Sequence, residues 1–265
     1  YEYLGGTMSV NIAETCVRGQ APNSKTSVAP LAIVAGLLLL IPGGLESYLV
    51  FGTVGGALGF AAVGAALVLF GVSTWVAEAL ARKNIVQGAA AFGLGLFLVM
   101  EFFAMIAFFA GLWMMHLFSE VWPPAGTPEM PYGTSVAMMA IIVISAVTIF
   151  TGGVRFKKGD LAGFRSALTL TIVLGVLFLG LRVAEYAHLL SIGFTAASNA
   201  FGTCYYGITA FHAISVLAGT GAFIAMLIPA LSGKVDKTFV SAASMFWFFN
   251  TVACIFVVTQ VYFWD

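Results

Sequence analysis

Long apolar segments, separated by short polar connections, fill most of this chain. A transmembrane helix needs about 20 mostly apolar residues to cross the hydrocarbon core of a bilayer. By this criterion the pattern predicts seven spans, over about residues 29–52, 54–81, 86–118, 133–153, 163–192, 200–231 and 238–264. The sequence therefore predicts an all-α, polytopic membrane protein with seven transmembrane helices, preceded by a polar N-terminal leader over residues 1–28.

The composition agrees with a membrane protein. Of the 265 residues, 61% are hydrophobic and only 8% are charged, whereas soluble globular proteins carry roughly 25% charged residues. The formal net charge is zero, so there is no electrostatic reason to expect a nucleic acid as a partner.

Basic residues occur in alternate connections between the predicted spans. They are Arg82 and Lys83, then Arg155, Lys157, Lys158 and Arg165, then Lys234 and Lys237, with Arg18 and Lys25 in the leader. The intervening connections contain no Lys or Arg. The positive-inside rule makes the basic side cytoplasmic, which predicts a cytoplasmic N-terminus and a C-terminus outside.

Glycines spaced four residues apart begin the second predicted span. Gly52 and Gly56 form one such pair, and Gly55 and Gly59 form another. Small residues at this spacing allow membrane helices to approach closely. In a chain with 30 glycines the spacing is also compatible with chance, and both interpretations stay open.

A carboxyl group lies in the middle of the third predicted span, at Glu101. An acidic residue at the centre of a membrane helix is unfavourable by about 3 kcal/mol on insertion scales. Glu101 is therefore expected either to fix packing through a hydrogen bond with a neighbour, or to serve a lipid, proton or subunit interface.

Further ionisable residues lie within the later spans. Arg182 and Glu185 are three residues apart on one predicted helix, so they can pair directly; a lipid or subunit contact is the alternative. His212 lies alone in the sixth predicted span, where a hydrogen-bonded packing role is favoured.

Haem, copper and iron–sulfur sites need clustered ligands. The three cysteines and three histidines of this chain are scattered, without a Cys-x-x-Cys pair. We therefore expect no catalytic, metal or cofactor-binding residues in this chain, and any haem or copper in partner subunits.

Several short motifs together resemble subunit III of the haem–copper oxidases, such as cytochrome c oxidase, over at least residues 75–264. They are Glu101 followed by aromatic residues and Trp113, Trp122-Pro123-Pro124, Thr134-Ser135-Val136, Lys158-Gly159-Asp160, Ala184-Glu185-Tyr186, Phe211-His212, Phe246-Trp247 and Tyr262-Phe263-Trp264. The chain departs from the family pattern at Ser215 and Phe248, where histidines are frequent, and at Thr251, where an acid is expected. These departures indicate a divergent, prokaryotic branch.

The resemblance implies a V-shaped bundle, with a two-helix arm over residues 29–81, a five-helix group over 86–264, and lipids in the cleft between them. It implies an accessory, non-catalytic subunit that packs against oxidase subunit I, with subunit II in the same complex, near a proton-uptake path. Such a subunit would sustain proton uptake and protect the active site from inactivation during turnover. Structural, lipid or subunit contacts are implied for Glu101, Glu185, His212, Trp75 and Trp247.

Lys234 and Arg182 are two further residues predicted to face a lipid or subunit. Lys234 is placed with Trp75 near the inner membrane interface, where an ammonium and an indole N–H would suit a lipid phosphate. Arg182 is included because it shares its helix face with Glu185.

The sequence leaves other functions open. The same family could serve a quinol oxidase or a nitric oxide reductase. A stand-alone transporter is less favoured, because repeats and a polar cavity at mid-membrane are expected of it. The sequence shows no repeats and few polar residues at mid-membrane. A membrane monooxygenase component would need clustered metal ligands.

Overall fold

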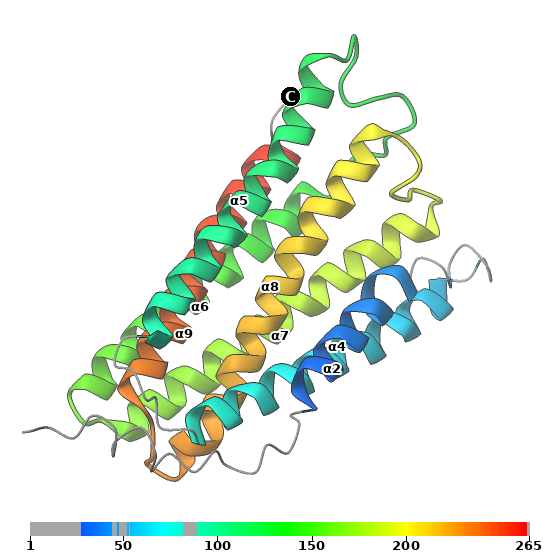
Figure 1. Cartoon of the computed structure of the whole chain (residues 1–265). Helices are drawn as coiled ribbons and strands as arrows, with labels where there is room; N and C mark the ends of the chain where they lie inside the picture. The colour runs from blue at the N-terminus through cyan, green and yellow to red at the C-terminus, as the bar shows by residue number, and fades with distance from the viewer. Residues whose placement is uncertain (1–27, 44–46, 48–51, 53, 82–88, 264–265) are drawn as a thin grey trace, which may run out of the picture.

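The computed structural model describes residues 28–43, 47, 52, 54–81 and 89–263 (Figure 1). The predicted leader up to residue 27, the end of the first predicted span, and Arg82 and Lys83 lie outside these residues. Within them, every helix is apolar over most of its length. The helices are α2 (Ala29–Leu38), continued by the π-helical turn η1 (Leu39–Gly43), then α4 (Val54–Ala81), α5 (Ala89–Leu117), α6 (Tyr132–Lys157), α7 (Leu161–Ser191), α8 (Ala200–Leu231) and α9 (Lys237–Tyr262).

The prediction of an all-α polytopic membrane protein is confirmed. In the described part of the chain, six helices, α4 to α9, are long and apolar enough to cross a membrane, and α2 is a shorter apolar helix. One predicted boundary was wrong by about a turn. Helix α6 continues to Lys157, so Arg155 lies in its last turn rather than in a connection. A cation is favourable there because the C-terminal end of a helix carries partial negative charge.

Side chains that accept backbone hydrogen bonds begin three of the helices. The Asp160 carboxylate accepts from the Gly163 N–H at 2.8 Å, and the Asn199 amide oxygen accepts from the Gly202 N–H at 2.8 Å. Asp236 accepts from two N–H groups at the start of α9. These caps satisfy N–H groups that have no partner within the helix, and they set where α7, α8 and α9 begin.

The connections gather at two ends of the bundle (Figure 1). At one end the Arg165 Nε donates to the Ala230 carbonyl at 2.8 Å, which joins the start of α7 to the end of α8. At the other end the Asn199 Nδ2 donates to the Thr127 hydroxyl at 2.8 Å, which joins the α7–α8 connection to the α5–α6 connection. The connections with basic residues, α6–α7 and α8–α9, therefore share one end.

Trp247 lies at the centre of the packing between α6, α7, α8 and α9. Its side chain is fully buried, and its indole N–H donates to the Ser145 hydroxyl at 2.9 Å. Small residues make room for the ring, because a Cβ added at Gly219 would lie 2.8 Å from it. Phe223 packs against the ring with centroids 5.0 Å apart. A second apolar cluster, around Phe109 and Tyr205, joins α5 to α7, α8 and α9.

Helix α2 packs along α4, and α4 packs against α8 and α7, while α5 packs against α8 and α9. The α2–α4 pair approaches closely at Gly36 and Gly64, where an added Cβ would lie 2.7 Å and 2.6 Å from backbone oxygens of the other helix. The Cβ at Gly64 would also lie 2.5 Å from the backbone nitrogen of Leu40 in η1. The predicted glycines behave differently: a Cβ at Gly55 or Gly59 would meet nothing within 4 Å. Helix α4 therefore does approach its neighbour closely, but at Gly64 rather than at the glycines near its start.

Replacing Gly64 with valine should loosen the contact between α2 and α4. The new Cβ would collide with the Leu40 backbone, and such overpacking destabilises a protein by about 1–3 kcal/mol. The measurement is the unfolding free energy of the detergent-solubilised protein. Gly59→Val is the matched control, because it adds the same side chain to the same helix in open space. Equal stability of the two variants would contradict the close approach.

Candidate functional site: the buried polar groups

Arg182 and Glu185 form the buried ion pair that their spacing on α7 predicts. The Arg182 Nη1 donates to the Glu185 Oε2 at 2.7 Å, and the two side chains are 3% and 0% exposed. The guanidinium carbon also lies 6.0 Å from the centroid of the Phe178 ring and 5.8 Å from that of Tyr186. Aromatic faces attract a cation, so the arginine is held by both charge and ring contacts.

Two tyrosines from neighbouring helices complete this pair. Tyr205 of α8 and Tyr262 of α9 each donate a hydroxyl hydrogen bond to the Glu185 Oε1, at 2.8 Å and 2.7 Å. Tyr262 also accepts a hydrogen bond from the Arg182 Nη1 at 2.7 Å. Sequence reasoning missed the role of these tyrosines. Their spacing carries no signal for it, because they lie on different helices from the ion pair.

His212 joins α8 to α9 and is fully buried. Its Nε2 lies 3.0 Å from the backbone oxygen of Asn250. Since a carbonyl oxygen can only accept, this nitrogen carries the hydrogen. The ring also meets Phe178 edge to face, with centroids 5.6 Å apart. The Asn250 amide nitrogen in turn donates to the Phe246 carbonyl at 3.0 Å. Within the described residues, the His212 ring thus contacts Asn250 and Phe178 rather than another histidine.

Glu101 joins α5 to α8. The carboxylate is buried, and its Oε1 accepts a hydrogen bond from the Ser215 hydroxyl. Its Oε2 is also buried and has no hydrogen-bond partner in the described part of the chain. The sequence departs from the family pattern at Ser215. In this chain the serine hydroxyl is a hydrogen-bond donor to the buried acid.

Trp75 and Lys234 are exposed, unlike the buried groups described above. Trp75 is 59% exposed on α4, and Lys234 is exposed in the connection between α8 and α9. No hydrogen bond or ring contact joins the two among the residues that the structure describes. Trp247, which shares its residue type with Trp75, is fully buried in the core. The seven predicted residues therefore form a buried group of five, held by contacts within this chain, and two exposed residues.

The arrangement holds polar groups in place but gathers no metal ligands. Across residues 28–43, 54–81 and 89–263, no group of three or more His, Cys, Asp and Glu residues is placed to hold a metal ion. Arg182 and Glu185 form an ion pair with each other, and the His212 Nε2 is hydrogen-bonded to the Asn250 carbonyl oxygen. The hydrogen bonds of Glu185 and His212 therefore join α7, α8 and α9 to one another.

Comparison with known proteins gives a consistent family. The model of the family described as cytochrome c oxidase subunit III matches residues 27–265. A probable cytochrome c oxidase subunit 3 from Nocardia farcinica is 31% identical over 166 residues, which cover 60% of this chain and 81% of that protein. The cytochrome c oxidase subunit 3 of Corynebacterium diphtheriae is 33% identical over 169 residues, covering 60% and 82%. That of Scyliorhinus canicula is 31% identical over 192 residues, covering 68% and 71%.

Breaking the buried ion pair should strongly destabilise the bundle. Removing one partner of a buried pair leaves the other charge uncompensated and costs about 3–5 kcal/mol. We expect this loss for Glu185→Gln in the unfolding free energy of the solubilised protein. Arg155→Gln is the control, since its pair with Asp160 is half-exposed and longer, at 3.6 Å, and exposed pairs contribute about 0–1 kcal/mol. A small effect of Glu185→Gln would contradict the pair's role.

Ser215→Ala should change the environment of the Glu101 carboxyl group. The infrared band of this group is assigned as the band that Glu101→Gln removes. Loss of the hydroxyl donor leaves a buried acceptor unsatisfied, which costs about 1–3 kcal/mol, and it should move the band. Ser166→Ala is the control, because the Ser166 hydroxyl is exposed and donates to its own helix at Ala162. An unmoved band in Ser215→Ala would show that the two side chains do not interact.

Proposed function

Since the chain belongs to the cytochrome c oxidase subunit III family, we propose that it acts as the accessory, non-catalytic subunit of its oxidase. Cytochrome c oxidase subunit III is a subunit of the terminal respiratory oxidase. In this proposal it packs against the catalytic subunit I, in a complex that also contains subunit II. It stabilises subunit I, sustains proton uptake and binds phospholipid. The haem and copper centres belong to the partner subunits.

The observation that carries this proposal is the family match over residues 27–265. The geometry of the buried groups supports it. Arg182, Glu185 and His212 are engaged in bonds that join α7, α8 and α9. Groups held in this way are suited to keeping a bundle rigid. A rigid bundle is what a supporting subunit needs at an interface with a catalytic partner.

Glu101 is the buried acid best suited to a role beyond packing. One of its oxygens accepts from Ser215, and the other has no protein hydrogen-bond partner among the described residues. The flanking residues Met100, Phe102 and Phe103 are each at least half exposed. The acid therefore lies close to the lipid- or partner-facing surface of α5. This placement supports a contribution of Glu101 to a lipid or subunit interface.

Lipid is proposed to bind between the α2–α4 arm and the five-helix group, as in the V-shaped cleft implied for the family. The exposed indole of Trp75 and the ammonium of Lys234 are candidates for contact with lipid headgroups. The membrane is proposed to be a prokaryotic cytoplasmic membrane, because several of the relatives are bacterial.

The orientation is proposed from charge. Arg155, Lys157, Lys234 and Lys237 all lie at the end of the bundle where Arg165 bonds to α8. The positive-inside rule makes this end cytoplasmic. The start of α2 would then face the cytoplasm, and the end of α9 would face outside.

The relatives named above are cytochrome c oxidase subunits. Their names support cytochrome c, rather than a quinol, as the electron donor of the proposed complex.

Gentle purification through a tag on this chain should isolate a coloured complex. We expect subunits I and II to co-purify, with the optical absorption of haem in the purified sample. The measurement is an absorption spectrum together with identification of the subunits by mass spectrometry. A colourless, homogeneous protein would contradict the proposal.

The supporting role is tested by removing the subunit. Oxidase depleted of this chain should begin turnover normally, then lose activity several-fold sooner than the intact complex, with slower proton uptake. Adding the purified chain back should restore both properties. An unchanged lifetime and an unchanged proton-uptake rate would refute the supporting role and leave family membership untouched.

A further inference from the structure

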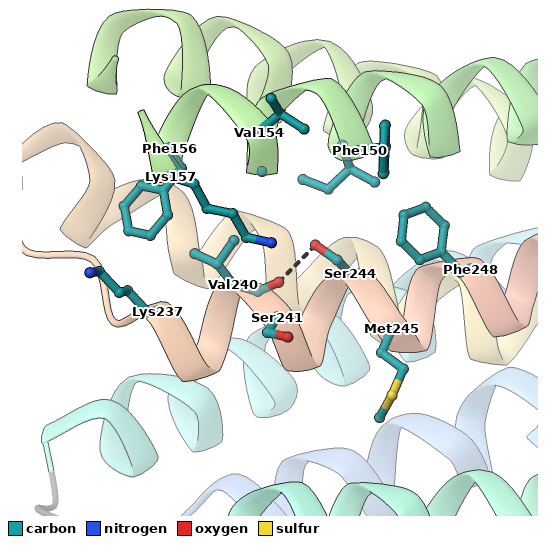
Figure 2. A pocket seen from close by; sticks show the side chains of 12 residues that line it. Phe150, Val154, Phe156, Lys157, Lys237, Val240, Ser241, Ser244, Met245 and Phe248 are labelled. Atoms are coloured by element: carbon teal, nitrogen blue, oxygen red, sulfur yellow. Dashed lines mark hydrogen bonds between the residues drawn. The ribbon is translucent and has the colours of Figure 1, made fainter. Parts of the chain in front are cut away.

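A groove of about 320 Å³ lies between α6 and α9, on helices that do not belong to the two-helix arm (Figure 2). Lys157 and Lys237 lie at one end of the groove, and Phe150 and Phe248 lie at the other. Gly153 and Val240 line the part between them. The groove thus has a cationic end and an apolar body.

The two lysines at the cationic end are not paired with a carboxylate of the described residues. Lys157 belongs to the last turn of α6, and Lys237 is the first residue of α9. Both are exposed, and among the described residues neither forms an ion pair. The neighbouring Asp236 uses its carboxylate to cap α9. Two ammonium groups at the mouth of one groove favour a negatively charged occupant.

The body of the groove favours hydrocarbon. Val154, Met245, Phe150 and Phe248 line it and are each more than a third exposed. The two phenylalanine rings approach with centroids 6.4 Å apart. A free phosphate ion would gain nothing from these walls. A molecule with an anionic head and an apolar chain would use both parts of the groove.

The dimensions and position also match a lipid. From Lys237 to Phe248, α9 rises by roughly 16 Å at 1.5 Å per residue. One leaflet of a membrane contributes about 15 Å of hydrocarbon, half of a core about 30 Å thick. The lysines lie at the end of the bundle that gathers the basic connections, where a headgroup would be expected. Basic pockets between transmembrane helices are known to take anionic lipid headgroups.

We propose that this groove binds an anionic phospholipid, with its phosphate at Lys157 and Lys237 and one acyl chain between α6 and α9. This site is separate from the proposed cleft beside the α2–α4 arm. It also does not depend on the proposed supporting role, because its evidence is the groove itself.

The test uses the intact complex, purified through this chain and reconstituted in nanodiscs that contain phosphatidylglycerol. Native mass spectrometry counts the phosphatidylglycerol molecules retained after release from the nanodisc. Lys157→Gln should weaken retention about fivefold, the effect expected for removing one ammonium group beside an anionic lipid. Lys158→Gln is the matched control, since this neighbouring exposed lysine does not line the groove.

A second variant fills the groove without changing any charge. Gly153→Leu places a side chain where an added Cβ meets nothing within 4 Å, so the helix can accept it. The variant should lose one bound phosphatidylglycerol. Gly180→Leu on α7 is its control, because that glycine also has open space but does not line the groove.

Each outcome decides the proposal. Weaker phosphatidylglycerol retention in Lys157→Gln and loss of one phosphatidylglycerol from Gly153→Leu, with neither effect in the controls, support it. Equal retention in all four variants overturns it, as does equal retention of phosphatidylcholine by the unaltered protein. Loss of a partner subunit from Gly153→Leu would show that protein, rather than lipid, covers the groove. The haem spectrum of each sample reports separately on whether the proposed oxidase complex is present.

Discussion

The buried charge of Arg182 constrains much of the bundle. A guanidinium in hydrocarbon is strongly unfavourable unless it is paired and hydrogen-bonded. Glu185, one turn further on the same helix, supplies the opposite charge. That carboxylate then needs donors of its own, and Tyr205 and Tyr262 bring them from α8 and α9. One ion pair thus fixes the relative rotation of three helices, because a rotated α8 or α9 would leave the glutamate short of a donor.

Similar bonds recur between other pairs of helices. They join Glu101 to Ser215, Trp113 to Gln260, Trp247 to Ser145, Thr148 to Thr171, and Ser73 to the Gly221 carbonyl. Hydrocarbon surrounds membrane helices on the outside as well as between them, so burying apolar surface gives little drive to associate. Close packing at small residues and interhelical hydrogen bonds must specify the arrangement instead. Gly64 against α2 and Gly219 against Trp247 supply the close packing.

These facts explain which features the sequence could predict. The spans follow from hydropathy, and the Arg182–Glu185 pair follows from spacing within one helix. The partners Ser215 and Tyr205 could not be predicted, because contacts across helices depend on helix rotation. An apolar stripe would normally reveal that rotation, but these helices are apolar on the lipid-facing side too: Phe103 is 64% exposed and Phe109, on the same helix, is buried. The end of α6 was placed too early, because the charged residues Arg155 and Lys157 resemble those of a polar connection. They instead form the last turn of the helix.

The distribution of polar groups also bears on how such a chain can act. Arg182, Glu185 and Trp247 each form a hydrogen bond with another helix of the same chain, to Tyr262, Tyr205 and Ser145 respectively. They are therefore committed to holding the bundle together and are poorly available to an external molecule. What the described part of the chain offers to its surroundings is mainly apolar helix surface, such as Phe150, and cationic groups at one end, such as Lys157. Contact of this part of the chain with a partner or a lipid would therefore depend on the shape and charge of that surface.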